Sequence, residues 1–160
     1  MKKHCIFLYL LLCTLSVFSQ DSWDVNYRYT TIDQIIRDIG TGLTTVENNY
    51  TGLFGEKYKI QMRFEGVIQS LDNKDREFMN GWVRSFQLPA NYSTLFSHKI
   101  LCSRNEKRHW IFVQNQSVEY YRNELSRRDN VYLYVMFLGS IITNGEKRYV
   151  VVANEFRKVE

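Results

Sequence analysis

Hydrophobic and polar residues alternate along segment 58–65, a pattern typical of a strand with one buried face. Apolar side chains stand at every second position and charged or amide side chains stand between them: Tyr58, Ile60, Met62 and Phe64 against Lys59, Gln61, Arg63 and Glu65. Beyond Gly66 apolar and polar residues alternate again, but the apolar positions are out of register with those before the glycine. We therefore predict a bulge or bend at Gly66, which lets one long strand serve two sides of a small barrel.

Shorter strand patterns follow. Residues 82–88 are predicted to form a strand that ends at Pro89, and residues 72–77 to form a solvated, charged turn before it. Segments 99–103 and 109–114 are predicted to pair as a hairpin around a polar turn at 104–107.

The C-terminal part of the chain predicts a second hairpin. Segment 131–138 is apolar on both faces, so we expect a strand that is covered on both sides. We expect this strand to end at Gly139. The dipeptide Asn144-Gly145 favours a type I′ turn, which leads into a last strand over 148–156.

Two segments have helical spacing instead. In the first, Thr31 and Gln34 stand at capping-box spacing, and isoleucines recur at helical intervals until Gly40 and Gly42 weaken the pattern. We interpret this isoleucine stripe as a docking face for the domain core, with a partner-binding helix as the alternative. The second predicted helix covers residues 118–125.

This order of elements resembles the oligonucleotide/oligosaccharide-binding (OB) fold over residues 57–158. The resemblance rests on Phe64-Glu65-Gly66-Val67-Ile68 in the first strand, on the helix at 119–125 and on the strand from Asp129 to Gly139. It implies a mainly β protein, an OB-like small closed β-barrel with one helix between strands 3 and 4, preceded by a short N-terminal amphipathic helix. Segment 72–114 departs from the pattern because it supplies three short strands where a five-stranded barrel needs two. A lipocalin-like or sandwich arrangement therefore stays open.

The N-terminus has the pattern of a secretory signal peptide over residues 1–19. Lys2 and Lys3 precede an apolar run that is too short to span a bilayer, and small residues follow before Gln20. We therefore predict an exported protein, periplasmic or extracellular, with no membrane span. The predicted organisation is signal peptide 1–19, a leader with a short helix at 20–56, and the barrel at 57–160.

Composition and charge limit the classes of protein to which the chain can belong. With 44% hydrophobic and 15% aromatic residues among 160, the chain has the composition of one folded domain. Loss of Lys2 and Lys3 lowers the basic count from 21 to 19 against 17 acidic residues, so the net charge falls from +4 to +2. Such a balance does not predict a strongly basic nucleic-acid binder. Cys102 would be the one remaining cysteine, which excludes an intramolecular disulfide.

Candidate chemistry is sparse. Neither His98 nor His109 has metal-ligand spacing, and the chain has no Walker loop and no nucleophile-elbow motif, so we predict no metal, no cofactor and no catalytic residue. The staphylococcal-nuclease family cleaves phosphodiesters on an OB scaffold, but its arrangement of acids and arginines has no match in this sequence. His98, Cys102 and His109 could meet across the hairpin and form a Cys/His thiol nucleophile, but we interpret Cys102, which lies in a strand pattern, as a buried, inert thiol.

The one predicted ligand-binding group is Trp82, Arg84 and Phe86. On a strand these residues share one face, and aromatic rings interleaved with a cation are typical of stacking platforms. Burial of the rings in the core is the competing interpretation. Our main hypothesis is a non-enzymatic binding module of the bacterial cell envelope for a peptide, glycan or protein partner. An exported nucleic-acid or nucleotide-binding OB domain is the alternative, and a hydrolase comes third.

Overall fold

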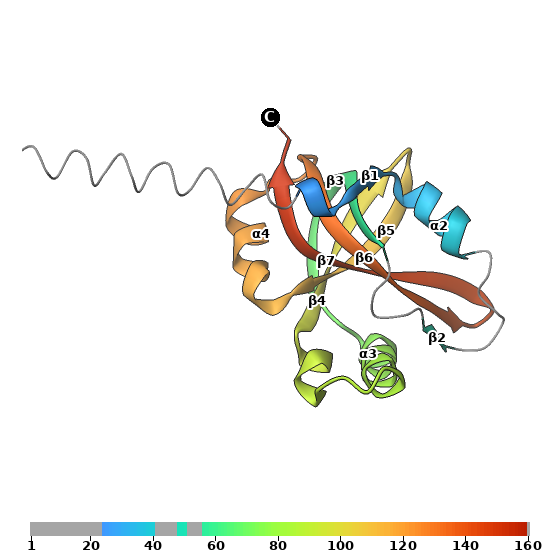
Figure 1. The fold of residues 1–160 in the computed structure, drawn as a ribbon. Helices are drawn as coiled ribbons and strands as arrows, with labels where there is room; N and C mark the ends of the chain where they lie inside the picture. Colours follow the sequence, from blue (N-terminus) through green and yellow to red (C-terminus); the bar gives the residue numbers. More distant parts are fainter. Residues whose placement is uncertain (1–23, 41–47, 51–55, 160) are drawn as a thin grey trace, which may run out of the picture.

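The computed structural model describes residues 24–40, 48–50 and 56–159, so the predicted signal peptide lies outside the described residues. Figure 1 shows a twisted sheet with helices placed around it. In chain order the strands and α-helices are β1 (Arg28–Thr30), α2 (Ile32–Gly40), β2 (Asn48–Tyr50), β3 (Lys57–Ser70), α3 (Asn73–Ser85), β4 (Phe96–Arg104), β5 (Lys107–Gln114), α4 (Val118–Glu124), β6 (Asn130–Thr143) and β7 (Glu146–Lys158). A short 3-10 turn, Ala90–Thr94, precedes β4, and another, Asn115–Ser117, precedes α4.

Five strands close into a ring. The neighbours run β3-β4-β5-β7-β6, and β6 pairs back with β3 through antiparallel partners from Lys57↔Met136 to Arg63↔Asn130. The pairing between β5 and β7 is parallel, whereas the other pairings within the ring are antiparallel. This order, with α4 between the third and fourth strands of the ring, is that of an OB-like barrel, so the predicted fold class is confirmed.

Gly66 marks the bend of β3. Its φ of +78° lies in the left-handed region, and the β3–β4 register shifts between Phe64 and Ile68. A Cβ at this position would stand 3.0 Å from the Cβ of Arg127. The predicted bulge is confirmed, and it lets β3 pair with β6 in its first half and with β4 in its second.

Gly139 does not end its strand, contrary to prediction, since β6 continues to Thr143. The β6–β7 register shifts between Phe137 and Gly139, so the glycine is a bulge within the strand. A Cβ at Gly139 would lie 1.9 Å from the carbonyl oxygen of Asn49, so the glycine is needed for the close approach of β2.

The predicted N-terminal helix is confirmed as α2. The backbone N–H of Gln34 donates to Thr31 Oγ1 at 3.1 Å, which satisfies one of the free donors of the first turn. Ile32 and Ile35 are buried among barrel-interior side chains, so the isoleucine stripe is a docking face. Before it, β1 runs parallel to β3 and pairs with the Tyr58–Ile60 part of that strand.

Segment 73–85 is the main correction to the predicted elements. It forms the helix α3, in place of a charged turn and the start of a strand. The helix packs outside the ring and makes a second hydrophobic core against β5, β6 and β7: Leu71, Phe78, Met79, Trp82, Val83, Phe96, Phe112, Leu138, Ile141, Val150 and Val152. The excess strand in segment 72–114 is thereby removed, and β4 and β5 supply the two strands that a five-stranded ring needs.

Candidate functional site

Trp82 and Phe86, two of the predicted ligand-binding residues, lie on one side of α3. Four positions in a helix return to the same face, and their ring centroids are 6.1 Å apart. Trp82 is 3% exposed in the second core, and Phe86 packs against that core. Arg84, two positions from each, is exposed. The shared strand face on which the platform hypothesis rested is therefore absent, and ligand binding by these three residues stays a prediction.

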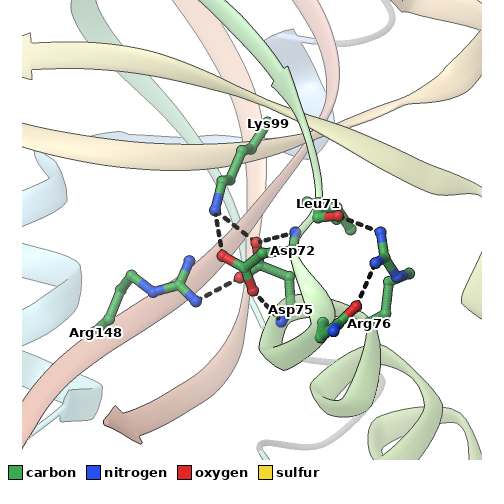
Figure 2. Close-up of polar contacts among 7 residues, drawn as sticks. Leu71, Asp72, Asp75, Arg76, Lys99 and Arg148 are labelled. Atoms are coloured by element: carbon green, nitrogen blue, oxygen red, sulfur yellow. Dashed lines mark hydrogen bonds and ion pairs between the residues drawn. The ribbon is translucent and has the colours of Figure 1, made fainter. Parts of the chain in front are cut away.

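The N-terminus of α3 holds a cluster of charges, shown in Figure 2, in which Asp75 and Lys99 are buried and Asp72 is exposed. Asp72 and Asp75 form a reciprocal capping box: the backbone N–H of Asp75 donates to Asp72 Oδ1 at 2.9 Å, and that of Asp72 donates to Asp75 Oδ2 at 3.1 Å. Asp75 is 0% exposed. The predicted turn is wrong because these residues form the cap and first turns of α3, and the predicted solvation is wrong for Asp75, whereas Asp72, Arg76 and Glu77 are exposed.

Two barrel cations neutralise this helix terminus. Lys99 Nζ on β4 donates to Asp75 Oδ2 at 2.6 Å and to Asp72 Oδ2 at 2.9 Å, and Arg148 on β7 donates to Asp75 Oδ1. Burying an unpaired carboxylate costs several kcal/mol, so the two cations make the burial of Asp75 possible. The cluster thus locks α3 onto the outer face of β4 and β7.

Electrostatics at the helix terminus favour the ionised form of Asp72. Partial burial raises its pKa, but the hydrogen bond from the Asp75 backbone and the ion pair with Lys99 outweigh this and lower the pKa to about 2. The ammonium of Lys99 also lies 5.2 Å from the centre of the Trp110 ring. Lys99 is 3% exposed, so this cation is used internally and does not face a ligand.

A hollow lies where β5 and β7 separate, and we call it the β5–β7 groove. The two strands pair over only three positions, from Ile111↔Val151 to Val113↔Ala153. Before these positions a hollow of about 610 Å³ opens between the strands and α2. Its lining comes from these three elements: Ile32, Asp33, Ile36, Lys107, Arg108, His109, Trp110, Glu146, Lys147, Arg148, Tyr149 and Val151.

This groove combines an apolar and aromatic floor with a charged rim. Lys107 pairs with Asp33 at 3.4 Å, and Arg148 is held by Asp75. Arg108 is exposed and makes no ion pair within the described residues, although its charge helps to lower the pKa of Glu65. These contacts leave a groove that fits a ligand with an apolar part and a negative group.

His109 has an unsatisfied atom in this groove. Its Nε2 is buried and has no hydrogen-bond partner among the described residues. Burial lowers the pKa of His109, against the opposing effect of Asp33, so the ring is neutral at pH 7. A buried polar atom without a partner costs free energy, and because Nε2 is closed to solvent it offers no hydrogen bond to a ligand in the groove.

Cys102 lies opposite His109 in the β4–β5 ladder, as the thiol-nucleophile alternative requires. The thiol is 0% exposed, and burial, with the nearby charge of Glu65, raises its pKa well above the ordinary value. A nucleophilic cysteine needs the opposite, an accessible and stabilised thiolate. Cys102 is therefore a core residue, and His98 lies apart from it, with Nδ1 2.7 Å from Ser97 Oγ.

Sequence reasoning missed the groove because it is made by strand divergence, which periodicity does not reveal. Segment 107–110 carried a signal, a run of cationic and aromatic residues at the start of a strand. Within the described residues no group of three or more His, Cys, Asp or Glu side chains could hold a metal ion. The helices among them are too short or too polar to cross a membrane.

The strand order defines an OB-like barrel, and comparison with known proteins adds little to it. No protein-family model and no curated protein matches the sequence. Among solved structures, the chain is similar to the mitochondrial single-stranded DNA binding protein Rim1 from S. cerevisiae, with 11% identity and a TM-score of 0.36 over 70% of this chain and 97% of that chain. The fold class therefore rests on the ring order and on the parallel pairing of β5 with β7, and not on this likeness.

Proposed function

We propose that the protein is a non-enzymatic binding module of the cell envelope that holds a segment of a peptide or protein partner in the β5–β7 groove. One observation supports it above the others: an apolar, aromatic-floored hollow of about 610 Å³ with Arg108 at its rim, an exposed cation that has no ion pair among the described residues. Ligand sites are concave, largely apolar and carry a few polar groups that orient the ligand. The signal-peptide pattern of residues 1–19 supports the envelope location.

The charge distribution also favours a peptide. Lys99 and Arg148 are paired with carboxylates of α3, and Lys107 is paired with Asp33. A phosphate backbone needs several cations along one track, whereas a peptide needs an apolar contact and one or two charges.

Single-stranded nucleic acid is the second candidate. Trp110 and Tyr149 line the same groove as Lys107, Arg108 and Lys147, and aromatic rings beside cations can stack bases and contact phosphates. The two candidates differ in their salt dependence, since phosphate contacts weaken steeply as salt rises.

The test compares two probes on the purified chain. A phage-displayed library of random linear heptapeptides is panned against the wild type, and a fluorescein-labelled 15-residue oligothymidylate is titrated at 50 and 200 mM salt. We expect enriched peptides that lose binding at least tenfold on Ile36→Glu, which puts a charge into the groove, and that keep it on the surface control Val67→Glu. Oligothymidylate binding that falls steeply between the two salt concentrations, with no enriched peptide, would overturn the proposal in favour of nucleic acid.

A further inference from the structure

Within the described residues, one edge of β5 and one edge of β7 border the β5–β7 groove without a strand partner. In an antiparallel ladder every second residue directs its main-chain N–H and C=O to the partner strand, and the residues between direct theirs to the opposite side. β5 uses one edge for β4 along its whole length, from Arg104↔Lys107 onward, but its other edge meets β7 only from Ile111. The edge of β5 over residues 107–110 thus borders the groove with no ladder partner among the described strands.

A side chain in the same part of β5 also lacks an ion-pair partner. Arg108 is an exposed cation without an ion pair in the described part of the chain. Ile36 of α2 and Trp110 line the hollow beside it. Main-chain donors and acceptors, a cation and an apolar contact therefore occur together over four residues.

We infer that the groove takes an acidic peptide in extended form, which adds as a strand along the β5 edge at residues 107–110 and places a carboxylate on Arg108. The inference rests on the proposed function and specifies its ligand. An extended segment of about four or five residues matches this edge, because four residues of strand span roughly 13 Å. Strand addition explains affinity through main-chain hydrogen bonds, and the side-chain sites explain selectivity. An aliphatic residue of the peptide then packs against Ile36 of α2.

The first experiment determines the consensus sequence of the heptapeptides that are enriched on the wild type. We expect an Asp or Glu within two positions of Val, Ile or Leu. Replacing the peptide's acid by its amide should weaken binding to the wild type about tenfold and should change little on Arg108→Gln. The matched control is Arg122→Gln, an exposed arginine of α4 that pairs with Glu119 and lies outside the groove.

The second experiment tests the extended pairing itself. A single N-methyl group is placed in turn on each backbone amide of one enriched peptide. Strand addition predicts an alternating result, with at least tenfold weaker binding at every second amide and little change at the amides between. A side-chain anchor without strand pairing would give no alternation.

The outcomes separate this inference from the proposed function. If no peptide is enriched, the proposed function fails, and the inference fails with it. If enriched peptides are blocked by Ile36→Glu but show no preference for an acid, no dependence on Arg108 or no alternation, the proposed function stands and the inference is overturned. Acidic consensus, Arg108 dependence and alternation together support it.

Discussion

The exposure of Trp82 depends on whether the residue lies on a strand or on a helix. On a strand it would share an exposed face with Arg84, but on α3 it points into the second core beside Phe86 and is 3% exposed. Asp75, also on α3, is buried as well, but it is charged. Its burial therefore depends on the ion pairs with Lys99 and Arg148. Both residues are expected to act on stability.

Trp82→Ala should lower the free energy of unfolding by about 3 to 5 kcal/mol, since a large buried side chain is replaced by a cavity. The measurement is urea denaturation followed by circular dichroism, with Arg84→Ala as the exposed control on the same helix. An unchanged midpoint for Trp82→Ala would mean that the ring is not core and would restore the platform hypothesis.

Asp75→Asn should destabilise the fold by about 3 kcal/mol, because it leaves two barrel cations without their shared buried counter-charge. Its control is Glu77→Gln, which removes an exposed pair with Lys74 at 3.8 Å and should change stability by less than about 0.5 kcal/mol. Equal effects of the two variants would contradict the structural role of the cluster.

At the scale of elements, most strands follow from local patterns. The β6–β7 turn has positive φ at both Asn144 and Gly145, as a type I′ turn requires, and α2 and α4 occupy the predicted segments. The α3 segment was misread although it carried a helical signal: Asp72 and Asp75 have capping-box spacing, and Phe78 and Trp82 are four residues apart. The alternation at 82–88 predicts a strand, but the four-residue spacing favours a helix, and the helix forms.

Gly66→Val should destabilise the barrel by about 1 to 3 kcal/mol, because valine is strained at a φ of +78° and its Cβ would press on Arg127. Thermal melting against the wild type measures this effect. Gly145→Ala is a useful comparison, since Gly145 also has positive φ but a Cβ there would meet no atom within 4 Å, so the loss of stability should be smaller. A melting temperature of Gly66→Val equal to that of the wild type would remove the argument for a bend.

The α3 terminus should also make stability depend on pH. The folded-state pKa of Asp72 is lowered from the ordinary value of 3.8 to about 2, so its contribution is complete above pH 4 and is lost as the pH falls through 2. Urea midpoints of the wild type and of Asp72→Asn, which keeps a helix-capping side chain, should therefore converge between pH 4 and pH 2. Parallel curves over this range would show that Asp72 is not stabilised in the folded state.

At the scale of the whole molecule, the β5–β7 groove belongs to no single element. β5 contributes Arg108 and His109, β7 contributes Tyr149, and α2 closes the hollow with Ile32 and Ile36. Local pattern predicted each of these elements, but the separation of two parallel strands before Ile111 arises only when the ring closes. This is why the fold class could be predicted from the sequence and the candidate site could not.

The most direct test of the groove as the ligand site uses the indole resonances of the three tryptophans, assigned by single Trp→Phe variants. One enriched heptapeptide is titrated into the chain labelled with 15N-tryptophan, and the indole N–H signals are followed by NMR. Binding in the β5–β7 groove predicts that the Trp110 signal shifts in a saturable way while the Trp82 signal stays in place. A saturable shift of Trp82 with Trp110 unchanged would contradict the groove and place the ligand on α3.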